Sequence, residues 1–175
     1  MSMTQVAFLR KADIPTKTQI DETIQGLGYD FKILDDSENI TELDGLSCSI
    51  NGYETFFETY FDQPTEITND CDWIKHDLTN QDIAVSFVWG ADFAVGACIG
   101  LISIALIDKG QAIVYYLDDE MKYTREMLVA DIPQFLNELE KQEKKRAPSP
   151  TEQKPTKNVE TEKSCFWDKL KHLFK

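Results

Sequence analysis

The chain has few of the residues that usually carry catalysis or bind metals. Only two of its 175 residues are histidines, His76 and His172. His76 precedes Asp77, but neighbouring residues on a helix or strand rarely face each other, so we expect no acid–base pair there. The four cysteines lack the spacing of metal ligands, and Cys71 with His76 would supply only two ligands of a zinc site. The sequence therefore predicts no metal site, no cofactor and no enzymatic activity.

Several sequence signals are also missing. The chain has no phosphate-binding loop, no Gly-x-Ser-x-Gly nucleophile motif and no His-Glu-x-x-His motif. Its N-terminus lacks the basic and apolar regions of a secretory signal peptide. The longest apolar segment, Phe93 to Ile107, is shorter than the roughly 18–20 residues of a membrane span. We therefore expect a cytoplasmic protein in a reducing compartment, with cysteines that are not paired in disulfides.

Basic residues are scarce in most of the chain. Residues 1–140 hold 26 acidic and 8 basic side chains (−18), residues 141–175 hold 5 acidic and 10 basic (+5), and the sum is the net charge of −13. Because an acidic body repels phosphate, we do not expect residues 1–140 to bind nucleic acid. Such a body would instead attract a basic protein partner and speed its arrival.

The apolar pattern predicts a single α+β domain over residues 1–140. Ile83 to Trp89 and Ala112 to Leu117 have the composition of strands, and they flank an almost entirely apolar helix from Phe93 to Ile107. A helix that is apolar on all sides must be buried. We therefore expect a mostly antiparallel sheet packed against this central helix and two further helices. Asn51 and Gly52, between two apolar runs, predict a β-hairpin.

The C-terminal part of the chain changes character. A last body helix is expected to start at Thr124, with a kink or a restart at Pro133, which lies inside its apolar pattern. Residues 141–163 are charged and contain prolines, which is typical of a flexible linker. Residues 164–175 predict a basic amphipathic helix, whose apolar face carries Phe166, Trp167, Leu170, Leu173 and Phe174.

The main candidate binding surface is the acidic stretch from residue 35 to residue 82. It has thirteen Asp and Glu residues and a single basic residue, Lys75. Aromatic residues beside these charges could anchor a partner, while the charges supply steering and specificity. The same carboxylates could instead form a solvated face that keeps the protein soluble. As calcium ligands they lack a twelve-residue loop with a central glycine. The predicted partner-binding residues are Tyr60, Asp62, Glu66, Asp70, Asp72, Trp73 and Asp77.

Residues 164–175 are the second candidate, and three interpretations stay open. A short basic helix with Trp and Phe could lie on an anionic membrane surface. It could insert its apolar face into a groove of a partner. It could also fold back on the acidic body.

Two stretches of the chain carry a resemblance. One contains Phe8, Leu9, Ile14 to Thr16 and Gly26 to Tyr29, and the other runs from Val85 to Asp92 into the small-residue helix. Together they resemble a group of small uncharacterised bacterial α+β proteins. An acidic single domain without catalytic residues is similar to the immunity proteins of bacterial toxin systems. The resemblance implies a cytosolic protein that blocks a cognate toxin.

Three hypotheses for function follow. The first is a non-enzymatic immunity protein that covers the basic active site of a toxin, and a nuclease would fit the charge best. The alternative is a membrane-peripheral adaptor or regulator that contacts the inner membrane through its C-terminal helix. The third is an enzyme with Asp or Glu chemistry, which would need a pocket near Trp89 and Asp92 and a carboxylate of raised pKa.

Overall fold

A computed structural model describes residues 2–146 of the chain, which form one α+β domain with a single antiparallel sheet. The sheet has seven strands in the order β2-β3-β4-β5-β1-β6-β7. The strands are β1 (Met3–Leu9), β2 (Phe31–Ile33), β3 (Gly45–Ile50), β4 (Tyr53–Asp62), β5 (Ile83–Trp89), β6 (Ile113–Tyr116) and β7 (Met121–Tyr123). The α-helices are α1 (Lys17–Gly26), α2 (Pro64–Thr68), α3 (Phe93–Gly110) and α4 (Arg125–Arg146).

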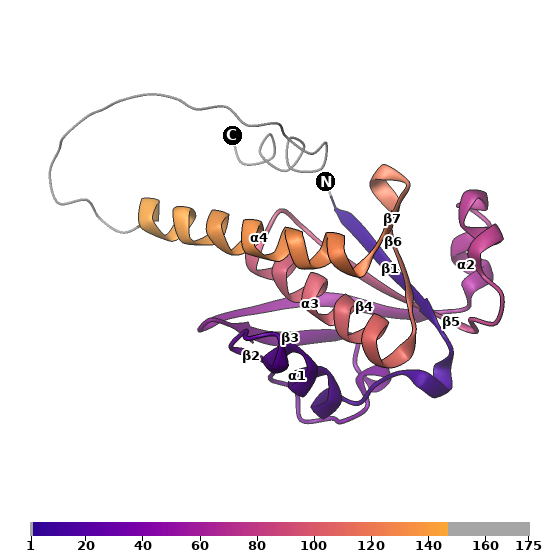
Figure 1. Cartoon of the computed structure of the whole chain (residues 1–175), viewed down its shortest axis with the longest axis horizontal. Helices are drawn as coiled ribbons and strands as arrows, with labels where there is room; N and C mark the ends of the chain where they lie inside the picture. Colours follow the sequence, from indigo (N-terminus) through magenta and orange to yellow (C-terminus); the bar gives the residue numbers. More distant parts are fainter. Residues whose placement is uncertain (1, 147–175) are drawn as a thin grey trace, which may run out of the picture.

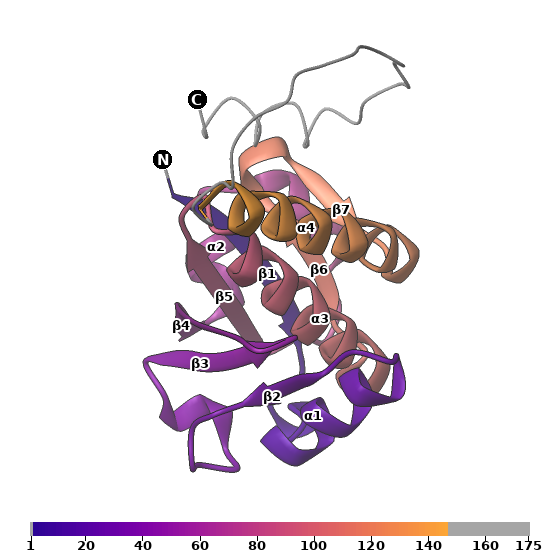
Figure 2. The same cartoon turned by 90° about the vertical axis from the view of Figure 1, so that its left-hand side faces the viewer.

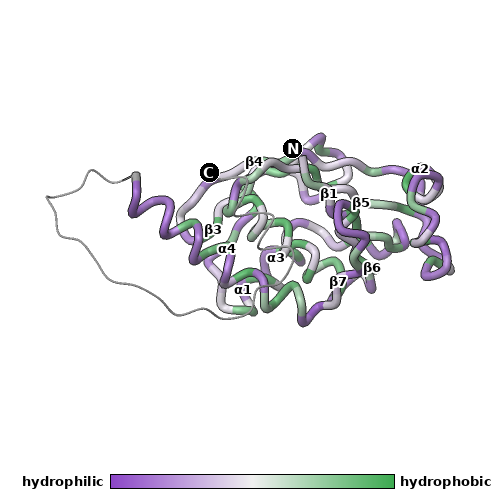
Figure 3. The backbone as a smooth tube through the Cα atoms, turned by 90° about the horizontal axis from the view of Figure 1, so that it is seen from above, coloured by the Kyte–Doolittle hydropathy of each residue, from purple (hydrophilic) through white to green (hydrophobic). Residues whose placement is uncertain are grey.

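Helices α1, α3 and α4 cover one face of the sheet (Figure 1, Figure 2). Every residue of α3 from Phe93 to Leu106 is buried. This confirms the predicted central helix and places it between the sheet, α1 and α4. Within the described residues, α3 alone has the length and composition to cross a membrane, and burial inside the fold accounts for its apolar sequence. Figure 3 shows that α4, by contrast, becomes hydrophilic toward its C-terminal end.

Local signals explain where the elements begin and turn. The Asp92 carboxylate accepts hydrogen bonds from the backbone N–H of Ala94 and Val95, at 2.8 and 3.2 Å, and so caps α3 as predicted. Between β3 and β4, Asn51 and Gly52 have φ of 50° and 81°, in the left-handed region that a tight hairpin turn requires. The predicted hairpin is therefore confirmed.

The structure bears on two predictions about α4. Of the kink or restart expected at Pro133, the restart does not occur, because the helix runs as one element from Arg125 to Arg146. Its residues on both sides of the proline are buried against α3, which holds the helix together: Leu128, Ile132, Phe135 and Leu139.

The predicted domain boundary at residue 140 also falls inside α4. Residues 141–146, predicted as linker, are helical. The pairs Glu138–Lys141 and Glu140–Lys144, at 2.7 and 3.7 Å, connect successive turns and support the extension. The rest of the predicted linker, residues 147–163, lies outside the described residues.

The second face of the sheet is covered over only part of its width. Residues 63–82, which we call the strap, contain α2 and a 3-10 helix (Asp72–Asp77). The strap buries Ile74 in a small second core with outward-facing side chains of β1, β5 and β6, namely Val6, Phe8, Ala84 and Tyr115. The strands β3 and β4 lie on the other side of β5, beyond this second core. The outer face of β4 is therefore the place where exposed side chains can gather.

Candidate functional site

The outer side of β4 exposes a row of alternating acidic and aromatic side chains. Successive residues of a strand point to opposite faces, so the intervening Phe57 and Thr59 are buried toward the helices. Phe56 is 59% exposed and Tyr60 is 46% exposed, the two highest values among the large apolar side chains in the part of the chain that the structure describes. We call this row the β4 face, and it consists of Glu54, Phe56, Glu58 and Tyr60.

The neighbouring strand β3 leaves the β4 face open. Small residues pair with the exposed positions: Gly45 lies opposite Glu58, and Ser47 lies opposite Phe56. The ring of Phe56 extends over Gly45, where a Cβ atom would overlap the ring. Phe56 therefore rests on backbone, and the residues of β3 that share its face, Gly45 and Ser47, are too small to cover it.

The carboxylates near the β4 face raise the pKa of Tyr60. The hydroxyl of Tyr60 donates a hydrogen bond to Oε2 of Glu58 at 2.7 Å. This hydrogen bond raises the pKa of Tyr60, and the charges of Glu58, Asp44 and Asp62 act in the same direction. Tyr60 therefore stays neutral at physiological pH, and the two exposed rings lie in a region of negative potential.

The structure divides the seven predicted partner-binding residues between two places. Tyr60 and Asp62 lie at the end of β4, and the other five lie on the strap. Glu66 and Asp70 are exposed there, and Asp72 forms an ion pair with Lys75 three residues later. The structure thus places one of the predicted residues, Tyr60, in the β4 face, with Asp62 two residues beyond it at the end of the strand.

Two of the predicted strap residues are engaged with the fold. The ring of Trp73 packs edge-on against the ring of Tyr115, with centroids 5.3 Å apart. Asp77 accepts a hydrogen bond from the Tyr115 hydroxyl at 2.5 Å and pairs with Lys122 at 2.9 Å. These two donors lower the pKa of Asp77. Both residues thus attach the strap to β6 and β7.

Sequence reasoning missed three of the four residues of the β4 face, namely Glu54, Phe56 and Glu58. Their signal was the period-two alternation of the second hairpin arm. Four even-numbered positions from 54 to 60 are exposed, whereas Phe57 and Thr59 are buried. The alternation alone could not show which side the helices would cover.

The thirteen carboxylates of residues 35–82 do not form one continuous patch. Several of them accept hydrogen bonds from neighbouring helices and strands. Asp35 accepts from the N–H of Ser47 at 2.8 Å, Glu38 accepts from the hydroxyl of Thr18 at 2.8 Å, and Asp82 accepts from the N–H of Lys11 at 2.6 Å. Some carboxylates of the acidic stretch therefore act as structural hydrogen-bond acceptors. The other carboxylates are spread over the segment before β3, the strand β4 and the strap.

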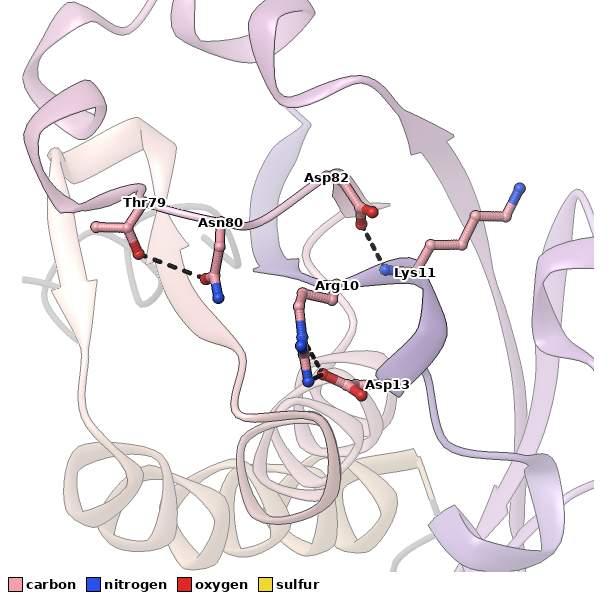
Figure 4. Close-up of polar contacts among 6 residues, drawn as sticks. All are labelled: Arg10, Lys11, Asp13, Thr79, Asn80 and Asp82. Carbon is pink, nitrogen blue, oxygen red and sulfur yellow. Dashed lines mark hydrogen bonds and ion pairs between the residues drawn. The ribbon is translucent and has the colours of Figure 1, made fainter.

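A polar cleft of about 220 Å³ lies between the end of β1, the end of the strap and the end of α3. Figure 4 shows residues in and beside this cleft. The Arg10 guanidinium points at Asp13, and the side chain of Lys11, which does not line the cleft, points away. Arg10 and Asp13 form an ion pair at 2.5 Å. Because that pair already neutralises the arginine, the cleft offers little charge to a ligand.

The enzyme hypothesis required a pocket near Trp89 and Asp92. Two further clefts have volumes of about 330 and 250 Å³, and neither of them nor the polar cleft is lined by those residues. Asp92 is used as the cap of α3. Burial raises the pKa of Asp21, but its carboxylate accepts from the N–H of Ile33 and so ties α1 to β2. Among the described residues no group of three His, Cys, Asp or Glu is placed to hold a metal ion.

The predicted membrane- or partner-binding helix lies outside the described residues, with Phe166, Trp167, Leu170, Leu173 and Phe174. Comparison with known proteins adds no relative: no family model, no curated protein and no solved structure matches this chain.

Proposed function

We propose that this chain is a non-enzymatic binding protein that engages a basic protein partner through the β4 face. The specific form of the proposal is a cytoplasmic immunity protein that neutralises a cognate toxin by covering its basic active site. A nuclease is the preferred class of toxin, because an enzyme that binds a polyanion needs a basic cleft.

The exposed rings of Phe56 and Tyr60 among carboxylates carry this proposal. Exposed aromatic residues supply much of the binding energy of protein interfaces, and acidic residues around them steer a basic partner and reject an acidic one. The net charge of −18 in residues 1–140 adds long-range attraction. The strand β4 pairs with β3 from Tyr53 to Glu58 and with β5 from Glu58 to Asp62, so the side chains of the β4 face are held in a fixed row.

Co-expression with the product of the adjacent gene tests the proposal. We expect the chain to bind that product and to restore growth if the product is toxic. Reversing the charge of the β4 face with Glu54→Lys and Glu58→Lys should weaken binding by about tenfold or more, because each lysine repels a basic partner.

The strap provides the matched control. Glu66→Lys and Asp70→Lys change the net charge by the same amount on exposed positions outside the β4 face. This variant should retain more affinity than the β4-face variant, and both should keep the circular dichroism spectrum of the parent. An adjacent gene product that neither binds nor is neutralised contradicts the proposal, and so does equal weakening by both variants.

A further inference from the structure

We propose that the β4 face selects arginine over lysine side chains of its partner. Each guanidinium would stack on the ring of Phe56 or Tyr60 and pair with the neighbouring carboxylate of Glu54 or Glu58. This inference rests on the proposed function and specifies the chemistry of the partner. Charge attraction to an acidic surface does not distinguish arginine from lysine, so a preference for arginine goes beyond the proposed attraction of a basic partner.

The spacing of the strand puts rings and carboxylates within reach of one guanidinium. Residues two apart on a strand are about 6.5–7 Å apart along one face. Phe56 therefore has a carboxylate on each side, from Glu54 and Glu58, and the Tyr60 hydroxyl is bonded to Glu58. A guanidinium is a plane with five N–H donors at its edge, so it can stack on a ring and donate to a carboxylate at the same time.

The open environment of Phe56 makes its ring available for stacking. More than half of the residue is exposed, and the positions beside it on β3 are Ser47 and Gly45. Neither of these can cover the ring. Because the ring rests against the backbone at Gly45, it is supported from below and can receive a flat group from the solvent.

Lysine fits this arrangement less well. Its ammonium group is a compact, strongly hydrated charge, and it cannot combine stacking with a two-pronged contact to a carboxylate. Cation–π attraction also favours arginine on exposed rings in proteins. The exposed strap carboxylates Glu66 and Asp70 provide an internal comparison. The aromatic ring that follows them in the strap is that of Trp73, and it packs against Tyr115. The strap should therefore attract arginine and lysine alike.

Two synthetic peptides of equal length and charge test the inference, one with arginine and one with lysine at alternate positions between glycine and serine. Their binding to the full chain is measured by fluorescence anisotropy at low salt, with the peptide labelled. We expect the arginine peptide to bind about tenfold more tightly, as one or two cation–π contacts would give.

Variants locate the source of the preference. Phe56→Leu with Tyr60→Leu keeps apolar side chains but removes both rings, and it should reduce the preference for arginine to nearly one. Glu54→Gln with Glu58→Gln should weaken both peptides. The matched controls are Val129→Leu, at an exposed apolar position of α4, and Glu66→Gln with Asp70→Asn on the strap. Both controls should keep the preference.

Three outcomes overturn the inference. They are equal binding of the two peptides, a preference that survives removal of both rings, and binding of neither peptide at low salt. The first two leave the proposed function in place, because an acidic surface could still receive a basic partner by charge alone. Failure of the co-expression experiment, with the arginine preference intact, would instead reject the immunity function and retain the arginine site.

Discussion

A single glycine determines how the ring of Phe56 is presented, and Phe56 is the most exposed of the large apolar residues that the structure describes. Gly45 lies on β3, diagonally across from Phe56, and the ring of Phe56 occupies the space that a Cβ atom would need. The carbonyl oxygen of Phe57 would also lie only 2.7 Å from such an atom. A larger residue at position 45 would therefore disturb both the pairing of β3 with β4 and the position of the exposed Phe56 ring.

The first prediction concerns this glycine. Gly45→Ala should lower the free energy of unfolding by about 1–3 kcal/mol, because the ring can move aside but the backbone oxygen cannot move freely. Urea denaturation followed by circular dichroism measures the change. Gly52→Ala is not a suitable control because its φ is 81°, whereas Gly90→Ala, which meets no atom within 4 Å, should change stability less. An equal effect of both variants would contradict this explanation.

At the scale of elements, the close approach of α3 and α4 depends on small residues of α3. Phe135 of α4 packs against Gly96, and Ile132 lies above Gly100 one turn later. A Cβ at Gly96 would lie 2.5 Å from Cε1 of Phe135, whereas a Cβ at Gly100 would lie 3.4 Å from Cγ1 of Ile132. The two glycines therefore have different roles despite their equivalent places in the sequence pattern.

The second prediction compares these two positions. Gly96→Ala should destabilise the protein by about 1–3 kcal/mol through overpacking against Phe135. Gly100→Ala should be neutral or stabilising by up to about 1 kcal/mol, because alanine favours the helix and the site has room. Thermal denaturation of both variants tests the order. Equal destabilisation would mean that α4 approaches Gly100 as closely as it approaches Gly96, and it would contradict the difference described between the two positions.

The strap is held to the sheet by a contact between distant parts of the chain. Asp77 joins the hydroxyl of Tyr115 and the ammonium of Lys122, and Asp82 accepts from the N–H of Lys11. These contacts fix both the buried ring of Tyr115 and the path of residues 63–82. They also make the attachment of the strap depend on pH.

The third prediction follows from the lowered pKa of Asp77. A carboxylate whose pKa is lower in the folded state stabilises the protein above its unfolded pKa of about 4, and this contribution is lost as pH falls through the folded pKa. Asp77→Asn should therefore lower the urea midpoint at pH 7, and the difference from the parent should shrink below about pH 4. Asp72→Asn, which removes an exposed pair with Lys75, serves as the control and should have a smaller effect. A difference that persists unchanged to pH 2–3 would show that the Asp77 charge is not responsible.

The charge of the whole molecule acts against its compactness. The body has 26 acidic and 8 basic residues up to position 140, and its ion pairs are exposed or half-exposed. Self-repulsion in such a molecule is long-ranged and is screened by salt, whereas exposed ion pairs contribute little.

The fourth prediction is that salt stabilises the fold. The melting temperature should rise by a few degrees between about 20 and 300 mM NaCl, because screening relieves repulsion among the carboxylates. Thermal circular dichroism on the full chain measures this. Charge reversal at Glu66 and Asp70 should make the rise smaller. A melting temperature that falls with salt would mean that attractive pairs outweigh the repulsion.

Much of the fold was predictable because its signals are local. The burial of α3 follows from a helix that is apolar on every side, the hairpin follows from Asn51 and Gly52, and the start of α3 follows from Asp92. The extension of α4 past residue 140 was missed. Of the kink or restart expected at Pro133, the restart does not occur, because packing against α3 outweighs the cost of the proline.

The candidate site was predictable in composition but not in place. The sequence by itself determined that the body is acidic, that its aromatic residues lie near carboxylates, and that the second hairpin arm alternates. Only the tertiary structure decided that the strap covers β1, β5 and β6 and leaves β4 open. The reason is that backbone sterics and periodicity act between near neighbours, whereas the strap is placed by contacts such as Asp77 with Tyr115, 38 residues apart, which exist only once the strands are in register.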